Sequence, residues 1–440
     1  MKNNKVIRSF VCTIVATEVV LLGKNKVKMR FLVMFISLSV VLEIFMYFCK
    51  INKTDMNTIL TKQKKRFFIL SIAAVLLLAV NACNAPKAQS IHENTPTEDS
   101  LIVVRVVAAG DAMAHSPQIT WAKDPKTNTY DFSGCFQYLD SILLQGDLNI
   151  VNLETTLAGA PYTGYPQFCA PDEFAQALRD AGFNFFLLAN NHSADKGTKG
   201  VKMTIEKMQN YNIPSAGTYL DEQDRKKRYP AMVEVQGIKI AILNYTYGTN
   251  GLTVEKPVFI NDLNDTTQIK EDIEAAKNSY PDIIVAFLHW GNEYQRYPNK
   301  KQKEQASFFL QQGVDVIVGS HPHVVQPVEY FAYDKTDTTK KKLVYWSLGN
   351  FISNQRNPHT DGGILASFSI VKNKNTQSVW VENHNTIPYW VYRNTSIRPG
   401  YFVLPIERFL NDTTTFSFSK EDKTAFENFV RNTNELLKGQ

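Results

Sequence analysis

Five short apolar runs, each followed by polar residues that can bind a metal ion, constrain this sequence more than any other feature. Runs of this length that are rich in valine, isoleucine and phenylalanine are typical of buried strands. The runs are Leu101–Ala109 before Asp111, Leu148–Leu153 before Glu154, Phe183–Ala189 before Asn190-Asn191-His192, Ile283–Leu288 before His289, and Val314–Val318 before Gly319-Ser320-His321. Because the carboxyl ends of parallel strands meet at one edge of a sheet, we expect these polar side chains to converge there.

Segments with helical spacing alternate with these runs, which predicts an α/β fold with buried strands. The expected helices are Glu173–Ala181, Lys199–Tyr211, Ile269–Ser279 and Lys301–Gln312. Other strands follow one another without a helix. They are Met232–Gln236 and Ile238–Asn244, which form a hairpin around Gly237, and Val324–Tyr333, Lys342–Leu348 and Ile364–Val371, which look antiparallel. The predicted fold class is therefore α/β, with a mixed β-sandwich flanked by helices in α/β/β/α order.

The N-terminal region has the pattern of an export signal. Basic residues 64–66 precede the apolar run Phe67–Val80, and a small residue, Ala82, precedes Cys83. This order is typical of a secretory signal, and a cysteine at the cleavage point resembles a bacterial lipobox. We expect residues 56–82 to be a signal peptide and Cys83 to carry a lipid, which would make the protein an extracytoplasmic, membrane-anchored lipoprotein. The alternative is an ordinary cysteine in an uncleaved anchor helix.

Residues 1–55 form a doubtful N-terminal extension. Its apolar segment Phe31–Phe48 is interrupted by Glu43 and is either a transmembrane helix or the product of a start codon assigned too early. Residues 83–100 are polar and lack periodicity, which indicates a flexible tether after the lipidated cysteine.

The charge of the chain argues against a nucleic-acid partner. The 440 residues carry a net charge of +6. Residues 1–82 contain 13 Lys/Arg and 3 Asp/Glu, a net +10, so the rest carries 6 − 10 = −4. A nucleic-acid-binding domain normally has the opposite balance. The cysteines show no CxxC spacing, and Cys135 and Cys169 of the folded part are predicted either to form one disulfide or to remain two buried thiols.

The polar residues at the strand ends form a donor set for transition metals. Imidazole, carboxylate and amide oxygen ligands together suit Zn, Mn or Fe. A two-metal site needs about seven protein ligands, and such a site clamps a phosphoryl centre and activates water. The predicted ligands of two divalent ions are Asp111, His115, Glu154, Asn191, His289, His321 and His323. An N-cap or ion-pair role remains open for Glu154, with Asn152 as the alternative ligand.

Further residues of these motifs have candidate roles in catalysis or substrate binding. His192, next to Asn191, is predicted to protonate a leaving group or to contact the substrate. Asp195 either fixes the tautomer of His192 or caps the helix that follows. Trp290, Glu293 and Tyr294 form either a substrate wall or packing contacts. Residues 347–351 are expected to form a tight turn close to the site.

Three motifs carry a resemblance to a known family. They are Asn190-Asn191-His192 followed by Asp195 and Gly197, Gly319-Ser320-His321-Pro322-His323-Val324, and Ser347-Leu348-Gly349-Asn350-Phe351. With these motifs the chain resembles the poly-γ-glutamate capsule synthesis proteins of the CapA type, which are similar to the calcineurin-like metallophosphoesterases. The resemblance covers about residues 103–369. It implies a metallophosphoesterase-like domain over residues 101–372, followed by an extension, 373–440, that ends in a helix from Lys420 to Leu437.

The metallophosphoesterase pattern also implies how the ligands divide. Asp111, His115 and His323 would hold one ion, Asn191, His289 and His321 the other, and Glu154 would bridge them. Two departures put the intermetal distance in doubt. Three residues separate Asp111 from His115, where the pattern has one, and the bridging position carries glutamate instead of aspartate.

The resemblance implies a cell-envelope protein that takes part in capsule or poly-γ-glutamate synthesis. In one interpretation a dinuclear-metal hydrolase acts on a phosphoester or an anionic polymer. In the other, an accessory protein binds the polymer for assembly or export without turnover. The expected partners are the polymer or ester, the membrane and other capsule-synthesis membrane proteins, with no nucleic acid.

Overall fold

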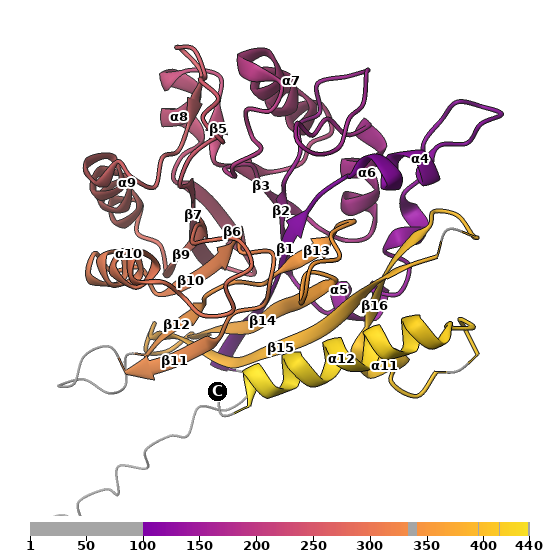
Figure 1. The fold of residues 1–440 in the computed structure, drawn as a ribbon. Coiled ribbons are helices and arrows are strands. Elements are labelled where there is room, and N and C mark those ends of the chain that lie inside the picture. The colour runs from indigo at the N-terminus through magenta and orange to yellow at the C-terminus, as the bar shows by residue number, and fades with distance from the viewer. Residues whose placement is uncertain (1–99, 333–340, 395, 413, 439–440) are drawn as a thin grey trace, which may run out of the picture. The chain divides into compact units, whose positions relative to one another are not determined.

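Two mixed β-sheets lie at the centre of the computed structural model, which describes residues 100–332, 341–394, 396–412 and 414–438 (Figure 1). The first sheet has the order β16-β15-β14-β1-β2-β3-β4, and β13 also pairs with β1. Its strands are β1 (Leu101–Ala112), β2 (Leu148–Leu153), β3 (Phe185–Leu187), β4 (Ser215–Ala216), β13 (Asn350–Ile352), β14 (Gly362–Asn373), β15 (Val379–Arg393) and β16 (Tyr401–Pro405). Strand β1 is parallel to β2 and antiparallel to β14.

The second sheet has the order β11-β12-β10-β9-β7-β6. Its strands are β6 (Ala231–Val235), β7 (Ile238–Thr246), β9 (Ile283–His289), β10 (Val316–Ser320), β11 (Val328–Ala332) and β12 (Lys341–Tyr345), and β5 (Thr218–Tyr219) pairs separately with β8 (Phe259–Ile260). The predicted hairpin around Gly237 is confirmed, since β6 and β7 are antiparallel neighbours. Strand β10 is parallel to β9 and to β12.

Helices cover the outer faces of both sheets (Figure 1). They are α4 (Ser116–Ala122), α5 (Asp140–Leu143), α6 (Asp172–Asp180), α7 (Gly197–Asn210), α8 (Glu222–Arg228), α9 (Thr266–Asn278), α10 (Lys300–Gln311), α11 (Ile406–Phe409) and α12 (Lys420–Leu437), with a 3-10 turn at Ser133–Cys135. Each of the four helices predicted between the strands is present, with ends that lie within three residues of the expected ones, and α12 has the predicted bounds.

Strand β9 shows how the layers are held together. Ile283, Val285 and Phe287 pack in the core between the two sheets. Ile284, Ala286 and Leu288 alternate with them and pack in a second core with α9 and α10. Because successive side chains of a strand point to opposite faces, a strand buried on both sides reads as one continuous apolar run. The predicted mixed α/β fold is confirmed, with layers in the order helix, sheet, sheet, helix.

The later strands agree with one expectation and correct another. The three strands expected to be antiparallel are so, but they lie in different sheets, because β11 pairs with β12 in the second sheet while β14 pairs with β1 in the first. Residues after Lys372, in contrast, do not form a small extension. Strands β15 and β16 continue the first sheet, and α12 packs its Phe426 and Phe429 against Trp390 of β15. The helix thereby buries the aromatic residues of β15 and β16.

The structure does not describe the N-terminal region, but it does describe the two cysteines of the folded part. The doubtful extension 1–55, the signal peptide 56–82, and Cys83 with its tether to residue 99 lie outside the part of the chain that the structure describes. In the described part, no helix combines the length and the hydropathy that crossing a bilayer requires. Cys135 and Cys169 are both buried and free, so of the two alternatives the structure has two thiols.

Candidate metal centre

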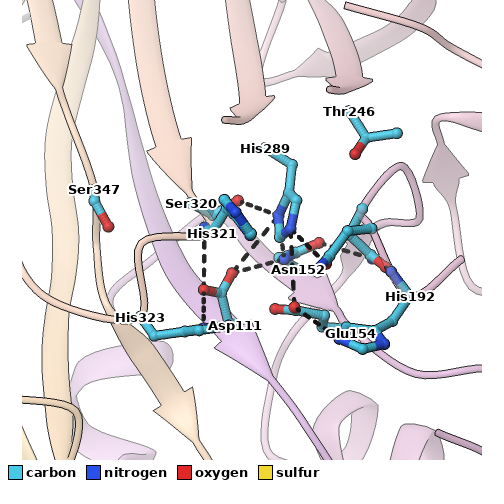
Figure 2. Close-up of polar contacts among 12 residues, drawn as sticks. Asp111, Asn152, Glu154, His192, Thr246, His289, Ser320, His321, His323 and Ser347 are labelled. Atoms are coloured by element: carbon cyan, nitrogen blue, oxygen red, sulfur yellow. Dashed lines mark hydrogen bonds and ion pairs between the residues drawn. The ribbon is translucent and has the colours of Figure 1, made fainter. Parts of the chain in front are cut away.

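Residues from the ends of both sheets meet in one buried cluster (Figure 2). Asp111 comes from β1, Glu154 directly follows β2, His289 ends β9, and His321 and His323 follow β10. None of these five residues is more than 3% exposed. The predicted convergence at the carboxyl ends of the strands is therefore present, and it joins the two sheets.

Asp111 is the most fully bonded member of the cluster. Its Oδ1 accepts a hydrogen bond of 2.8 Å from Nδ2 of Asn152, and its Oδ2 accepts one of 3.1 Å from the backbone N–H of His321. Nδ1 of His323 lies 3.1 Å from the same Oδ2. Burial by itself would raise the pKa of Asp111, but the His323 hydrogen bond and the nearby histidine charges outweigh it and hold the pKa below its usual value. The carboxylate therefore stays ionised.

Glu154 is the opposite case. It is fully buried, and neither of its carboxylate oxygens has a hydrogen-bond partner among the described residues. Its Oε1 lies 3.8 Å from Nε2 of His289 and 4.0 Å from Nε2 of His192. Burial and then the charge of Asp111 raise the pKa of Glu154 well above its ordinary range. An unpaired buried carboxylate costs free energy, and a cation between it and the imidazoles would remove that cost.

Two histidines of the cluster, His289 and His321, are in the neutral state that binds metals. Burial lowers the pKa of His289 to about 3 and that of His321 well below its ordinary value, so both imidazoles are neutral. Nε2 of His289 lies 2.9 Å from Oδ1 of Asn191, and its Nδ1 lies 3.0 Å from Oγ of Ser320. A metal-binding histidine usually has its second ring nitrogen oriented in this way. Nδ1 of His321 is buried without a hydrogen-bond partner among the described residues.

The loop after β10 holds its two histidines in a strained backbone. His321 has φ 96° and His323 has φ 58°. This left-handed region is uncommon for residues with a side chain, and such strain persists where the surrounding structure fixes it, often at functional sites. The hydrogen bond from the His321 N–H to Asp111 is one such constraint. The strain turns both rings toward the ends of β1 and β9.

Two groups of side chains have ligand atoms close enough to share an ion. Asp111, Glu154 and His289 form one group, and Glu293, His321 and His323 form the other, with the ligand atoms of each group within 4.8 Å of one another. The unpartnered oxygens of Glu154 and the neutral imidazoles fit divalent transition metals. The residues present therefore suit the predicted cofactor, although they are grouped differently from the division that the resemblance implied.

His115 belongs to neither group. Its backbone N–H donates to Oε1 of Gln118, which starts α4 with a capping box. Its Nδ1 lies 3.2 Å from the same Oε1 and accepts from the backbone N–H of Asn354 at 3.3 Å. Burial lowers the pKa of His115 to about 4. The ring is thus neutral and oriented, but it packs beside Phe168 and not among the other expected ligands.

The predicted catalytic pair is in contact. Nδ1 of His192 lies 2.7 Å from Oδ2 of Asp195, and the backbone N–H of Phe168 donates to that oxygen at 2.6 Å. The cap residue of α7 is Lys196, and no side chain bonds to that helix end. Of the two alternatives for Asp195, the structure therefore has the contact with His192, whose Nε2 faces Glu154.

The sequence analysis did not identify Phe168 as a residue of the site, and it left the roles of Glu293 and Trp290 open. The Phe168 ring lies edge-on between two histidine rings, with centroids 4.9 Å from His115 and 4.7 Å from His192. Oε1 of Glu293 lies 4.0 Å from Nε2 of His323, and its side chain is 45% exposed. The signal for Glu293 was its place four residues after His289. Trp290 is a packing residue, since it is fully buried and donates from Nε1 to the Trp346 carbonyl at 3.0 Å.

The fold and the cluster define a class of mixed α/β sandwich proteins in which buried histidines and carboxylates meet at the strand ends. A comparison with protein families assigns the chain to one family of this class. Residues 105–355 match the model of the bacterial capsule synthesis protein PGA_cap family, and the chain belongs to that family. The resemblance to the CapA type is thereby confirmed.

The chain is also similar to individual relatives and to solved structures. The chain is 29% identical over 333 residues to the PGA biosynthesis protein CapA of Bacillus subtilis (strain 168), covering 71% of this chain and 80% of the relative. It is 25% identical over 325 residues to the capsule biosynthesis protein CapA of Bacillus anthracis, covering 71% and 74%. Among solved structures, the calcineurin-like phosphoesterase YfkN from Bacillus subtilis matches with a TM-score of 0.40 and 12% identity, covering 77% of this chain and 98% of that chain.

Proposed function

We propose that this protein acts in the synthesis of a capsule or similar anionic exopolymer, such as poly-γ-glutamate, through a dinuclear-metal site of hydrolase type. One observation carries the proposal. Glu154 is a fully buried carboxyl group without a hydrogen-bond partner among the described residues, and it faces the neutral imidazole of His289. Burial disfavours its charged form and raises its pKa, and a bound cation would stabilise the carboxylate. Membership of the capsule synthesis family supports the polymer as the substrate class.

The proposed ligands of two divalent ions are Asp111, His115, Glu154, Asn191, His289, His321 and His323. Five of them have ligand atoms in the two groups described above, which do not include His115 or Asn191. Glu293 is an additional carboxylate beside His323. Bound ions of this kind polarise the ester or amide bond and stabilise the negative charge that develops during its cleavage. His192 holds a proton for the leaving group. Asp195 accepts a hydrogen bond from Nδ1 of His192, which leaves Nε2 directed at the cluster.

The metal content of the purified full chain tests this proposal. About two transition-metal ions per chain are expected for the wild type, and a His321→Ala, His323→Ala double variant should lose them. The wild type should then cleave a phosphoester or a γ-glutamyl oligomer. A folded chain that binds no Mn, Zn or Fe would refute the hydrolase proposal. Full metal content without cleavage of either substrate class would leave polymer binding during assembly or export as the function.

We also propose that the protein is an extracytoplasmic lipoprotein that is anchored through Cys83 and works beside other membrane proteins of capsule synthesis. The export pattern and the cysteine after Ala82 support this proposal. Mass spectrometry of the mature chain should find an N-terminal lipidated Cys83, and a Cys83→Ala variant should leave the membrane fraction. An unmodified chain that begins before Cys83 would refute the anchor. Cross-linking in cells should capture membrane proteins of capsule synthesis.

A further inference from the structure

A cavity of about 710 Å³ lies on the helix-covered face of the first sheet. Its lining residue Val107 also belongs to the core between this sheet and the helices. Arg105, another lining residue, precedes Asp111 on β1, and the rise of about 3.3 Å per strand residue separates the two by roughly 20 Å. The cavity is therefore separate from the metal centre, and its volume is in the range of small-molecule sites.

The floor of the cavity is polar because the residues on this face of β14 change from apolar to polar along the strand. On β14, Leu365 packs into the core, whereas Ser367 and Ser369, on the same face, line the cavity. The pairing of β14 with β15 shifts register between Ser367 and Ser369, and Asn383 opposite has φ 49°. Bulges of this kind redirect side chains. The hydroxyls of both serines form no hydrogen bond with another described residue, so they are free to bind a ligand.

Two arginines supply the charge of the cavity. Neither Arg105 nor Arg408 forms a side-chain hydrogen bond or an ion pair with any residue in the described ranges, and Glu407 is the single carboxylate in the lining. The Arg408 guanidinium lies 4.8 Å from the Tyr138 ring centroid and 5.6 Å from that of Phe409. These contacts with aromatic rings use none of its N–H groups as hydrogen-bond donors to an oxygen or nitrogen atom. Both arginines can therefore donate paired hydrogen bonds to an anion.

We propose that this cavity is a second binding site, independent of metal, for a carboxylate-bearing segment of the anionic polymer. Guanidinium groups match carboxylates with two parallel hydrogen bonds, and the serine hydroxyls add donors between them. The identity of the polymer rests on the proposed function. A segment held here raises the local concentration of the rest of the same chain at the metal centre.

Calorimetric binding of a γ-glutamate oligomer to the full chain in detergent, with a chelator present, tests the second site. Arg105→Gln and Arg408→Gln should each weaken binding by about tenfold, the effect of one lost hydrogen bond to a charged group. Glu407→Gln should tighten binding by about threefold because it removes a repelling charge. Arg179→Gln is the matched control, since Arg179 pairs with Asp180 on α6 and lies outside the cavity lining.

The outcomes separate this site from the proposed catalytic function. Binding that survives chelation and responds to all three substitutions supports the site, even if no bond is cleaved. Binding that disappears with the metal, or that the Arg105→Gln, Arg408→Gln double variant retains, overturns it while leaving the hydrolase proposal intact. Glycerol 3-phosphate serves as the soluble mimic of a lipid headgroup. Arginine-dependent binding of that ligand alone would also overturn a polymer site.

Discussion

Nδ1 of His323 lies 3.1 Å from Oδ2 of Asp111, although 212 positions separate the two residues in the chain. Asp111 belongs to β1 of the first sheet, and His323 follows β10 of the second. Their contact therefore joins the two sheets at the edge where the candidate ligands gather. An ion held between these side chains would bind the folded protein and not the unfolded chain.

Removal of metal should consequently lower thermal stability. A ligand present at about 1,000 times its dissociation constant stabilises the folded state by about 4 kcal/mol. We expect a chelator to lower the Tm of the wild type by several degrees. An Asp111→Asn, His323→Ala double variant should show no further shift with chelator, and His384→Ala, outside the cluster, should behave as the wild type. An unchanged wild-type Tm in a chain proven to lose metal would contradict the prediction.

Glu154→Gln should change stability in opposite directions with and without metal. Burial and the charge of Asp111 raise the pKa of Glu154 above its ordinary 4.5, so the folded metal-free protein binds this proton more tightly than the unfolded chain. Its stability therefore falls as pH rises from 4.5 through the raised pKa. The Glu154→Gln variant has no carboxyl group at this position, so its stability should not fall with pH for this reason.

Urea denaturation provides the measurement. In chelator, at about pH 8, Glu154→Gln should be more stable than the wild type, and the difference should vanish as pH falls toward the unfolded-state value. With metal the order should reverse, because the wild-type carboxylate binds the ions. A metal-free variant that is less stable than the wild type at every pH would contradict the burial of an unpaired carboxylate.

His192→Ala should reduce turnover without reducing metal content. General acid catalysis by a histidine typically contributes 10²–10⁴-fold, so kcat should fall by about that factor. Asp195→Asn should have a smaller effect, because the imidazole remains while the hydrogen bond that orients it changes. Steady-state kinetics with parallel metal analysis distinguish the two roles. Unchanged kcat in His192→Ala on every accepted substrate would remove the assigned role.

Gly110→Ala should destabilise the protein through a backbone clash. A Cβ at this position would collide with the carbonyl oxygen of Gly349, where β13 approaches β1. Overpacking of this kind costs about 1–3 kcal/mol, and the displaced strand should also weaken metal binding through Asp111. Gly248→Ala is the control, since its Cβ would meet no atom within 4 Å. Equal unfolding free energies for the two variants would contradict the close approach.

Apolar runs predicted the strands well where both faces are buried. Strand β2 has its predicted bounds, Leu148–Leu153, because the apolar run ends where the polar residues of the site begin. Strand β3 is shorter than the predicted run Phe183–Ala189, because its neighbour β4 offers only Ser215 and Ala216 for pairing. Strand β14 could not be assigned to the first sheet, since an alternating pattern indicates a strand but not its partner.

The sequence predicted those residues of the site that directly follow a strand, but not those that lie in loops. Five of the seven expected ligands fall into the two groups that can hold an ion, and a sixth, Asn191, contacts His289 of one group. His115 is apart, because the capping box at α4 sets its ring direction. Phe168 gave no signal, since an apolar residue in a loop looks like packing. The orientation of Glu293 depends on the unusual backbone at Gly291 and Tyr294, with φ 90° and φ 67°.

The pairing of β1 with β14 has a consequence for the chain during its synthesis. Leu101 pairs with Asn373, so one neighbour of β1 in the sheet is synthesised about 270 residues after β1 itself. Contacts this distant in sequence form late. A nascent or prematurely terminated polypeptide ending before His323 lacks part of the metal centre. Any chemistry that requires the contact between Asp111 and His323 can therefore begin only after both sheets have been synthesised and have packed together.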